Sequence, residues 1–382
     1  MITRIPRHRS IEAWTAVIAM VAAAAALAAA QETGMASGRF LLGGYSGHLL
    51  VLDEKTEQVI ARVPLSTGFP ASTRVSRDGA RAYALSANRQ QFEIVDLVER
   101  KSVDAFTLNQ QTTRLSIQGF EPDPANRFLY VAGRASARLR DHFSIAAPAL
   151  YKYDLARHEI VSQAAWGEDF EPPFFVSMRV SPDGTLLYVF LDKVIVYRTS
   201  DLTRSGEFDL ARPVESGVGP SSMGALDHMV DDGDSLTGLF TIQDAVQKQR
   251  RILGVGRFDL ARQTVDFFTL GPVPESAWGL EFAIAPDRKH AYLLTQPIDG
   301  YEFWTIDMDA RRVERRLPFN GRPRMSLRTS ADGSIYILGA GNTIDVYDPD
   351  GLKFLRTITL DTDVPYGTFH ELPRPRGTGP PQ

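Results

Sequence analysis

The sequence contains no cysteine among its 382 residues. Without cysteine the chain cannot form disulfides, bind a metal through thiolates, use a thiol nucleophile or attach haem through cysteine side chains. Histidine is scarce: no two of the seven residues lie three to five positions apart, so local zinc-binding motifs are missing. The net charge is small too, because the chain has 42 basic and 46 acidic residues. The sequence therefore lacks the excess of basic residues that is typical of nucleic-acid-binding proteins.

Common catalytic motifs are missing as well. Residues 43–47 read Gly-Gly-Tyr-Ser-Gly, which has the wrong spacing for a nucleophile in Gly-x-Ser-x-Gly. Residues 254–256 are only a fragment of a dinucleotide-binding fingerprint and lie within a strand pattern. We therefore predict no catalytic residue, no metal site and no cofactor in this chain.

The N-terminus has the order of a secretory signal peptide. Arg4, Arg7 and Arg9 precede an apolar run from Trp14 to Ala30, and small residues end that run. We expect cleavage after Ala30 and a mature chain that is periplasmic or secreted. A retained membrane anchor is the alternative, although 17 residues are at the short end of what spans a bilayer.

One unit recurs through the rest of the chain: an Asp-Gly turn, or a variant of it, followed by a short β-prone run. Asp in such a turn bonds its own backbone two residues on, and Gly supplies a positive φ. We interpret these aspartates as turn residues rather than as calcium ligands, because they lie far apart in the sequence. Six copies are visible, at residues 76–79, 122–124, 181–184, 231–233, 285–288 and 330–333.

A second recurring unit is an apolar strand that ends in Asp. From Asp53 to Asp348 the chain covers 295 residues in six intervals, which gives a mean spacing of about 49. This period is typical of four-stranded propeller blades. The copies end at Asp53, Asp96, Asp154, Asp259, Asp307 and Asp348, with residues 195–198 as the one departure.

These repeats predict an all-β fold, a seven-bladed β-propeller of four-stranded antiparallel blades. The first blade lacks an innermost strand, whereas residues 367–372 are left over as a lone strand at the other end. We therefore predict that the C-terminal strand closes the ring, because closure covers an otherwise exposed sheet edge. The predicted organisation is a signal peptide at 1–30, one propeller at 31–372 and a disordered Pro/Gly-rich tail at 373–382.

Two segments carry a resemblance to a known family. Residues 181–189, Ser-Pro-Asp-Gly-Thr-Leu-Leu-Tyr-Val, resemble the repeat of the YVTN propellers. The last blade, from Met325 to Leu360, resembles that of the propeller chains of quinoprotein amine dehydrogenases. Within this family the chain is most similar to the β subunit of quinohemoprotein amine dehydrogenase, and next to the heavy chain of methylamine dehydrogenase. The resemblance implies that the quinone cofactor and the haem belong to partner subunits.

We accordingly expect an exported, non-catalytic scaffold that presents a loop-lined face to a partner or a small ligand. Expected partners are small quinone-bearing and haem subunits, which would make the chain a subunit of an amine dehydrogenase, or another exported protein. Nucleic acid is not expected, nor is a membrane after signal cleavage. The alternative is a propeller enzyme of the lactonase type, whose family resembles this one in repeat and fold.

Candidate binding residues come from the segments that precede the innermost strands, because rigid scaffolds carry their sites on loops. Acidic side chains interleaved with aromatic ones suit a cationic or amine-bearing ligand through ion pairing and cation–π contact. Alternatively, they are ordinary solvated charges and rim aromatics. The candidates are Trp166, Glu168, Asp169, Glu171, Asp227, His228, Glu275, Trp278 and Glu281.

An insertion from Gly133 to Pro148 contains Arg134, Arg138 and Arg140. We expect it to be an extra loop, of a length that is typical of a partner or ligand contact or of a disordered segment. Residues 109–118 are expected to form another loop, which leads to an innermost strand.

Overall fold

The computed structural model describes residues 38–166, 175–191, 193–208, 218–223, 230–231, 235–244, 250–274, 278–296, 300–322 and 324–372. The chain divides into two units, of which one is Gly38–Pro373 and contains every described residue. The other comprises Met1–Ser37 and Arg374–Gln382 and lies outside the described residues, as do the whole predicted signal peptide and the whole predicted tail. In the described part no helix is long and apolar enough to cross a membrane.

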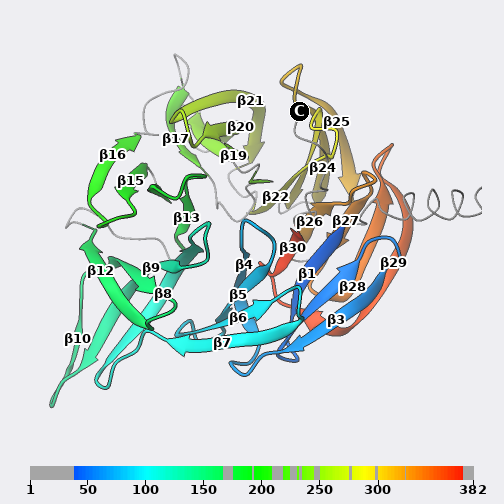
Figure 1. Ribbon diagram of the computed structural model, residues 1–382. Coiled ribbons are helices and arrows are strands. Elements are labelled where there is room, and N and C mark those ends of the chain that lie inside the picture. Colours follow the sequence, from blue (N-terminus) through cyan, green and yellow to red (C-terminus); the bar gives the residue numbers. More distant parts are fainter. Residues whose placement is uncertain are drawn as a thin grey trace, which may run out of the picture. The chain divides into compact units, whose positions relative to one another are not determined.

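Seven antiparallel sheets form the seven blades of a β-propeller, as the repeats predicted. Figure 1 shows the blades following one another in sequence order, with β4, β13, β22 and β30 near the centre of the ring. From the centre outward, blade 1 has β30 (Phe369–Leu372), β1 (Arg39–Gly44), β2 (His48–Asp53) and β3 (Gln58–Pro64). Blade 2 has β4 (Pro70–Val75), β5 (Arg81–Ser86), β6 (Gln91–Asp96) and β7 (Lys101–Thr107).

Blades 3 and 5 each carry a short fifth strand. Blade 3 has β8 (Thr113–Pro122), β9 (Phe128–Arg138), β11 (Ala149–Asp154) and β12 (Glu159–Ala165), with β10 (Phe143–Ile145) beside β9. Blade 4 has β13 (Ser177–Val180), β14 (Leu186–Phe190), β15 (Val194–Arg198) and β16 (Arg204–Phe208). Blade 5 has β17 (Val218–Met223), β19 (Ser235–Asp244), β20 (Arg250–Asp259) and β21 (Thr264–Pro274), with β18 (Val230–Asp231) beside β19.

Blades 6 and 7 complete the set with four strands each. Blade 6 has β22 (Trp278–Ile284), β23 (His290–Gln296), β24 (Tyr301–Asp307) and β25 (Arg312–Phe319). Blade 7 has β26 (Ser326–Thr329), β27 (Ile335–Leu338), β28 (Gly341–Asp348) and β29 (Lys353–Val364).

Burial follows the position of a strand within its blade. The two middle strands of blade 1, β1 and β2, are almost wholly buried, because neighbouring blades cover both faces of the sheet. The outer strand β12 instead alternates between exposed and half-buried positions, as expected for a two-residue period. The core is divided into clusters between blades; one joins Phe40 and Leu50 of blade 1 to Tyr336 and Ile344 of blade 7.

The C-terminal strand closes the ring, as predicted. β30 pairs antiparallel with β1 in a register that runs from Leu42 opposite Phe369 to Arg39 opposite Leu372. The Phe40 ring lies 5.0 Å from the Phe369 ring and 4.9 Å from the Tyr336 ring, measured between centroids. Closure therefore adds buried aromatic contacts to the backbone pairing of a sheet edge.

The Asp-Gly turns have the local chemistry that the sequence predicted. In blade 2, Asp78 Oδ1 accepts a hydrogen bond from Ala80 N at 3.0 Å, and Gly79 has a φ of +70°. In blade 4, Asp183 Oδ1 accepts one from Thr185 N at 3.1 Å. These carboxylates thus bind backbone amides at the start of the second strand of their blades.

Two expected loops of blade 3 are strands instead. β9 continues to Arg138, and the first half of β8, from Thr113 to Ile117, pairs with this extension. β10 pairs with the other side of it. The result is a three-stranded extension of residues 113–117, 134–138 and 143–145, which we call the finger. Residues 139–142 connect its second strand to its third. The expectation of loops at 109–118 and 133–148 was wrong over these strands. Each of the segments is ordered by pairing with the extension of β9.

The two ends of the blades differ in their connections. We call the end at which the innermost strands begin the loop face, and the end that carries the Asp-Gly turns the turn face. Backbone hydrogen bonds tie neighbouring blades at the loop face: Tyr45 N donates to Asp363 O at 2.9 Å, and Val176 N donates to Gln118 O at 2.9 Å. The loop face is therefore a connected surface from blade to blade.

Candidate functional site

Most of the side chains predicted to bind a ligand lie outside the described residues. Trp278 starts β22, where its backbone pairs with Gln296, and its side chain is not among those described. Trp166 is described and is buried in a cluster with Tyr130 and Val176, so its ring packs in the core between blades 3 and 4. The candidates outside the described part are Glu168, Asp169, Glu171, Asp227, His228 and Glu275.

Glu281 is the predicted site residue whose surroundings are best defined. It lies on β22, and only 1% of its surface is exposed. Its Oε1 accepts a hydrogen bond from the Tyr366 hydroxyl at 2.7 Å, and its Oε2 accepts one from Leu327 N at 3.2 Å. Arg328 Nη1 lies 3.5 Å from the same Oε2. The carboxylate thus joins blades 6 and 7 to the segment before the closing strand.

The innermost strands carry three more half-buried charges that the sequence analysis missed. Arg74 of β4, Glu121 of β8 and Arg179 of β13 occupy the same register, two residues before Ser76, Asp123 and Ser181 respectively. Arg74 Nε lies 3.9 Å and Arg179 Nη1 lies 3.6 Å from Glu121 Oε2. Ion pairs therefore join the innermost strands of blades 2, 3 and 4. These three charged residues could have been found in the sequence, because each occupies the same position before a repeated turn. Arg328 occupies the equivalent position in blade 7.

Exposed aromatic rings gather at the loop face. Tyr45 and Phe69 lie there in contact, with ring centroids 4.9 Å apart. Phe175 lies under the Arg89 guanidinium, whose carbon is 4.6 Å from the ring centroid. Arg89 Nε in turn donates to Ile117 O at 2.7 Å, which holds the cation in place. Exposed rings beside a fixed guanidinium are the side-chain types that dominate protein–protein interfaces.

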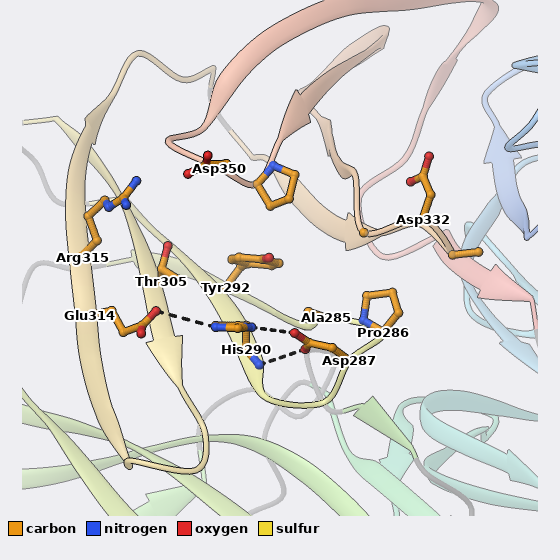
Figure 2. Close-up of a pocket in the computed structure, with 13 residues that line it drawn as sticks. Ala285, Pro286, Asp287, His290, Tyr292, Thr305, Glu314, Arg315, Asp332 and Asp350 are labelled. Carbon is orange, nitrogen blue, oxygen red and sulfur yellow. Dashed lines mark hydrogen bonds and ion pairs between the residues drawn. The ribbon is translucent and has the colours of Figure 1, made fainter.

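A pocket lies on the turn face between blades 6 and 7. Its volume is about 590 Å³, and Figure 2 shows the side chains that converge on it. Its acidic groups are Asp287, Glu314, Asp332 and Asp350, against His290 and Arg315. Tyr292 contributes a ring whose phenol has its pKa raised to about 12 by burial, so the hydroxyl stays neutral. An acidic cavity with an aromatic wall is suited to a cationic group.

His290 stands between two carboxylates in this pocket. Its Nδ1 lies 2.6 Å from Asp287 Oδ2, and its Nε2 lies 3.9 Å from Glu314 Oε2, as the dashed lines in Figure 2 mark. The hydrogen bond to Asp287 raises the pKa of His290, against the opposing effect of burial, and the charges of Asp287, Glu314 and Asp307 raise it further. Protonation is thus more favourable here than for an ordinary histidine, and a protonated His290 makes the pocket less negative.

The sequence analysis did not single out this pocket. Its residues come from the turns and strands of two blades, and the turn residues Asp287 and Asp332 were interpreted as structural only. In the described part of the chain, no three His, Asp or Glu side chains are grouped to hold a metal ion.

Comparisons with known proteins give the fold alone. No protein-family model matches the chain, and no curated protein sequence matches it significantly. A functionally unknown protein from Desulfotomaculum acetoxidans has 11% identity and a TM-score of 0.52, over 87% of this chain and 98% of that one. Hydrazine synthase from Kuenenia stuttgartiensis has 18% identity and a TM-score of 0.49, over 83% and 90%. Dihydro-heme d1 dehydrogenase NirN has 15% identity and a TM-score of 0.48, over 86% and 74%.

Proposed function

We propose that the chain is an exported, non-catalytic binding scaffold whose loop face receives a partner protein. One observation carries the proposal: the described part of the propeller exposes six large aromatic rings, and four of them lie at the loop face. The four are Tyr45, Phe69, Phe175 and Tyr366.

Rigidity supports a docking role for this face. Tyr366 is held by its hydrogen bond to Glu281, and Phe175 by its contact with Arg89. Side chains that are already fixed lose little conformational freedom when a partner binds, so less of the interaction energy is spent on ordering them. Backbone hydrogen bonds between blades hold the surrounding segments in the same way.

The proposed partner follows the resemblance to the propeller chains of quinoprotein amine dehydrogenases. In such a complex, small subunits would hold the quinone and the haem, and the propeller would orient them. Another exported protein is the alternative partner. In either case this chain contributes the binding surface. In the amine dehydrogenase complex, electron transfer would belong to the partner subunits.

A propeller enzyme of the lactonase type is the second candidate function. The pocket between blades 6 and 7 favours it, because His290 lies there between Asp287 and Glu314 in a cavity of about 590 Å³. An imidazole between two carboxylates can act as an acid or a base, but no nucleophile motif of the sequence accompanies it. We therefore place the scaffold first.

The decisive experiment is purification of the tagged chain from the exported fraction, with two double variants beside the wild type. Tyr45→Ser with Phe69→Ser removes two rings of the loop face, whereas Phe354→Ser with Leu355→Ser removes two exposed apolar side chains from the outer strand β29. We expect a stoichiometric partner with the wild type and the β29 variant, and its loss from the loop-face variant. Equal retention by all three, or turnover of an amine or a lactone by the chain alone, would contradict the proposal.

A further inference from the structure

One face of the finger combines positive charge with exposed apolar side chains. In the antiparallel pairing, Phe143 stands opposite Arg138 and Ile145 opposite Ser136, and Arg114 of β8 also stands opposite Ser136. Opposite residues project to the same side of a sheet, and so do residues two apart along a strand. Phe143, Ile145, Arg114 and Arg138 therefore share one exposed face, at whose base Arg134 is half-buried.

The other face of the finger is the one that packs on the propeller. It carries Leu115 and Ala135, which belong to the core cluster of blades 2 and 3. The basic and apolar side chains are consequently directed away from that cluster. Phe143 is 70% exposed and Ile145 68%, and Leu139, in the turn next to them, is also exposed. An exposed group of three large apolar side chains at a tip is unusual for a surface that remains in water.

The charge of the finger contrasts with that of the whole protein. The chain carries a net charge of −4, yet residues 134–145 hold three arginines and a single acidic residue, Asp141. The Asp141 carboxylate lies 2.7 Å from His142 Nδ1, so it faces the imidazole of its neighbour. The finger thus forms a local positive patch on an acidic protein, and its complement is an anionic surface.

We propose that the finger binds the surface of an anionic phospholipid bilayer. Phe143, Ile145 and Leu139 enter the boundary between headgroups and acyl chains, while Arg138 and Arg140 contact lipid phosphates. This revises the expectation that the mature chain has no membrane contact. The proposed membrane contact uses the tip of the finger, whereas the proposed partner interface uses aromatic rings at other blades. The base of the finger touches that interface, because Arg89 Nε donates to Ile117 O.

A second copy of the chain fits the finger less well. The free edge of β10 is only three residues long, which is short for a strand pair. Pairing two such edges would also leave the exposed arginines of the finger without an opposite charge. A phosphate-bearing surface meets the same arginines with attraction and accepts the three apolar side chains at its boundary.

The test is co-sedimentation of the full chain with vesicles of phosphatidylcholine alone or mixed with phosphatidylglycerol. Arg138→Glu with Arg140→Glu reverses two positive charges of the finger. Phe143→Ser with Ile145→Ser removes the two exposed apolar side chains of β10. Phe354→Ser with Leu355→Ser is the matched control on β29. All variants share one N-terminus, so differences between them report on the finger. At about 1 kcal/mol for each arginine near an anionic surface, charge reversal should weaken binding by at least about tenfold.

A label provides a second readout, because the chain has no cysteine of its own. Ser136 stands opposite Ile145 and shares its face. An environment-sensitive fluorophore on Ser136→Cys should shift to shorter wavelength with the mixed vesicles, and one on Gln163→Cys, on the outer strand β12, should not. Unchanged melting temperatures show that the variants fold. The proposal is overturned if the wild type binds neither vesicle, if it binds both equally, if the β29 control weakens binding as much, or if the finger instead mediates dimerisation or binds only an acidic protein.

Discussion

The Tyr366 hydroxyl donates a hydrogen bond to Glu281 Oε1 at 2.7 Å across 85 positions of the sequence. Tyr366 precedes the ring-closing strand β30, and Glu281 belongs to the innermost strand of blade 6. The contact therefore fixes a rim aromatic of the loop face to a buried carboxylate. It couples closure of the ring to the shape of the proposed binding surface.

This pair predicts a measurable coupling energy. Glu281→Gln should lower the free energy of unfolding by about 2 kcal/mol, because hydrogen bonds to a buried carboxylate are stronger than those to an amide. Tyr366→Phe removes one donor and should cost about 1 kcal/mol. Denaturant unfolding of the single and double variants gives the coupling as a double-mutant cycle. Additive losses, with no coupling, would show that the bond contributes nothing to stability.

Glu93 predicts a loss of stability in acid. It is fully buried on β6, and its Oε2 accepts hydrogen bonds from Ser66 Oγ, Thr67 N and Thr67 Oγ1, each at 3.0 Å. Burial alone would raise the pKa of Glu93, but the hydrogen bonds from Ser102, Thr67 and Ser66 outweigh it and lower the pKa.

A lowered folded-state pKa gives stability that is fully present above the unfolded value of 4.5 and is lost as the pH falls through the folded value. Glu93→Gln should therefore be less stable than the wild type at neutral pH, and the difference should shrink below about pH 4.5. Urea unfolding at several pH values checks this. A difference that does not change with pH would exclude the carboxylate as its source.

The His290 ring should titrate above the usual histidine range. Its raised pKa means that its contribution to stability is present below about pH 6.5, the unfolded value, and is lost as the pH rises through the folded value. Asp287→Asn keeps an oxygen for the turn amides but removes the charge at 2.6 Å, so it should lower the pKa. Glu314→Gln acts from 3.9 Å and should lower it less. NMR titration measures all three forms; an unchanged pKa in Asp287→Asn would contradict the assignment.

Ring closure predicts a large effect from one side chain. Phe369 is fully buried against Phe40, so Phe369→Ala should cost about 4 kcal/mol through lost burial and a cavity. Phe354→Ala removes the same ring from the exposed outer strand β29 and should cost less than about 1 kcal/mol. Equal melting temperatures for the two variants would refute the closure account.

The fold was predictable because its signals are local and repeated. In the turns at Asp78 and Asp183, the Asp carboxylate accepts a hydrogen bond from a backbone amide two residues later. Such turns can therefore be recognised from a short segment of sequence. The first blade lacks an innermost strand in the sequence, and a surplus strand lies at Phe369. Together these two features predicted that the C-terminal strand closes the ring. The finger was not predictable in this way, since residues 113–117 become a strand only by pairing with the extension of β9.

The candidate site was predictable only in part. Glu281 was selected as a loop-face acid, yet its role is set by Tyr366 and Leu327, which reach it from other blades. Asp287 and Asp332 resemble ordinary turn residues in the sequence, and only the neighbouring position of blades 6 and 7 turns them into walls of one pocket. Contacts between blades have no local signature, which is why the pocket escaped the sequence analysis.

The most direct test of the scaffold is hydrogen–deuterium exchange of the native complex compared with the isolated chain. The account predicts added protection at the loop face, in the segments around Tyr45, Phe69 and Tyr366, with little change at the turn face. Protection confined to residues 285–290 and the neighbouring turns of blade 7, or no protection anywhere, would contradict it.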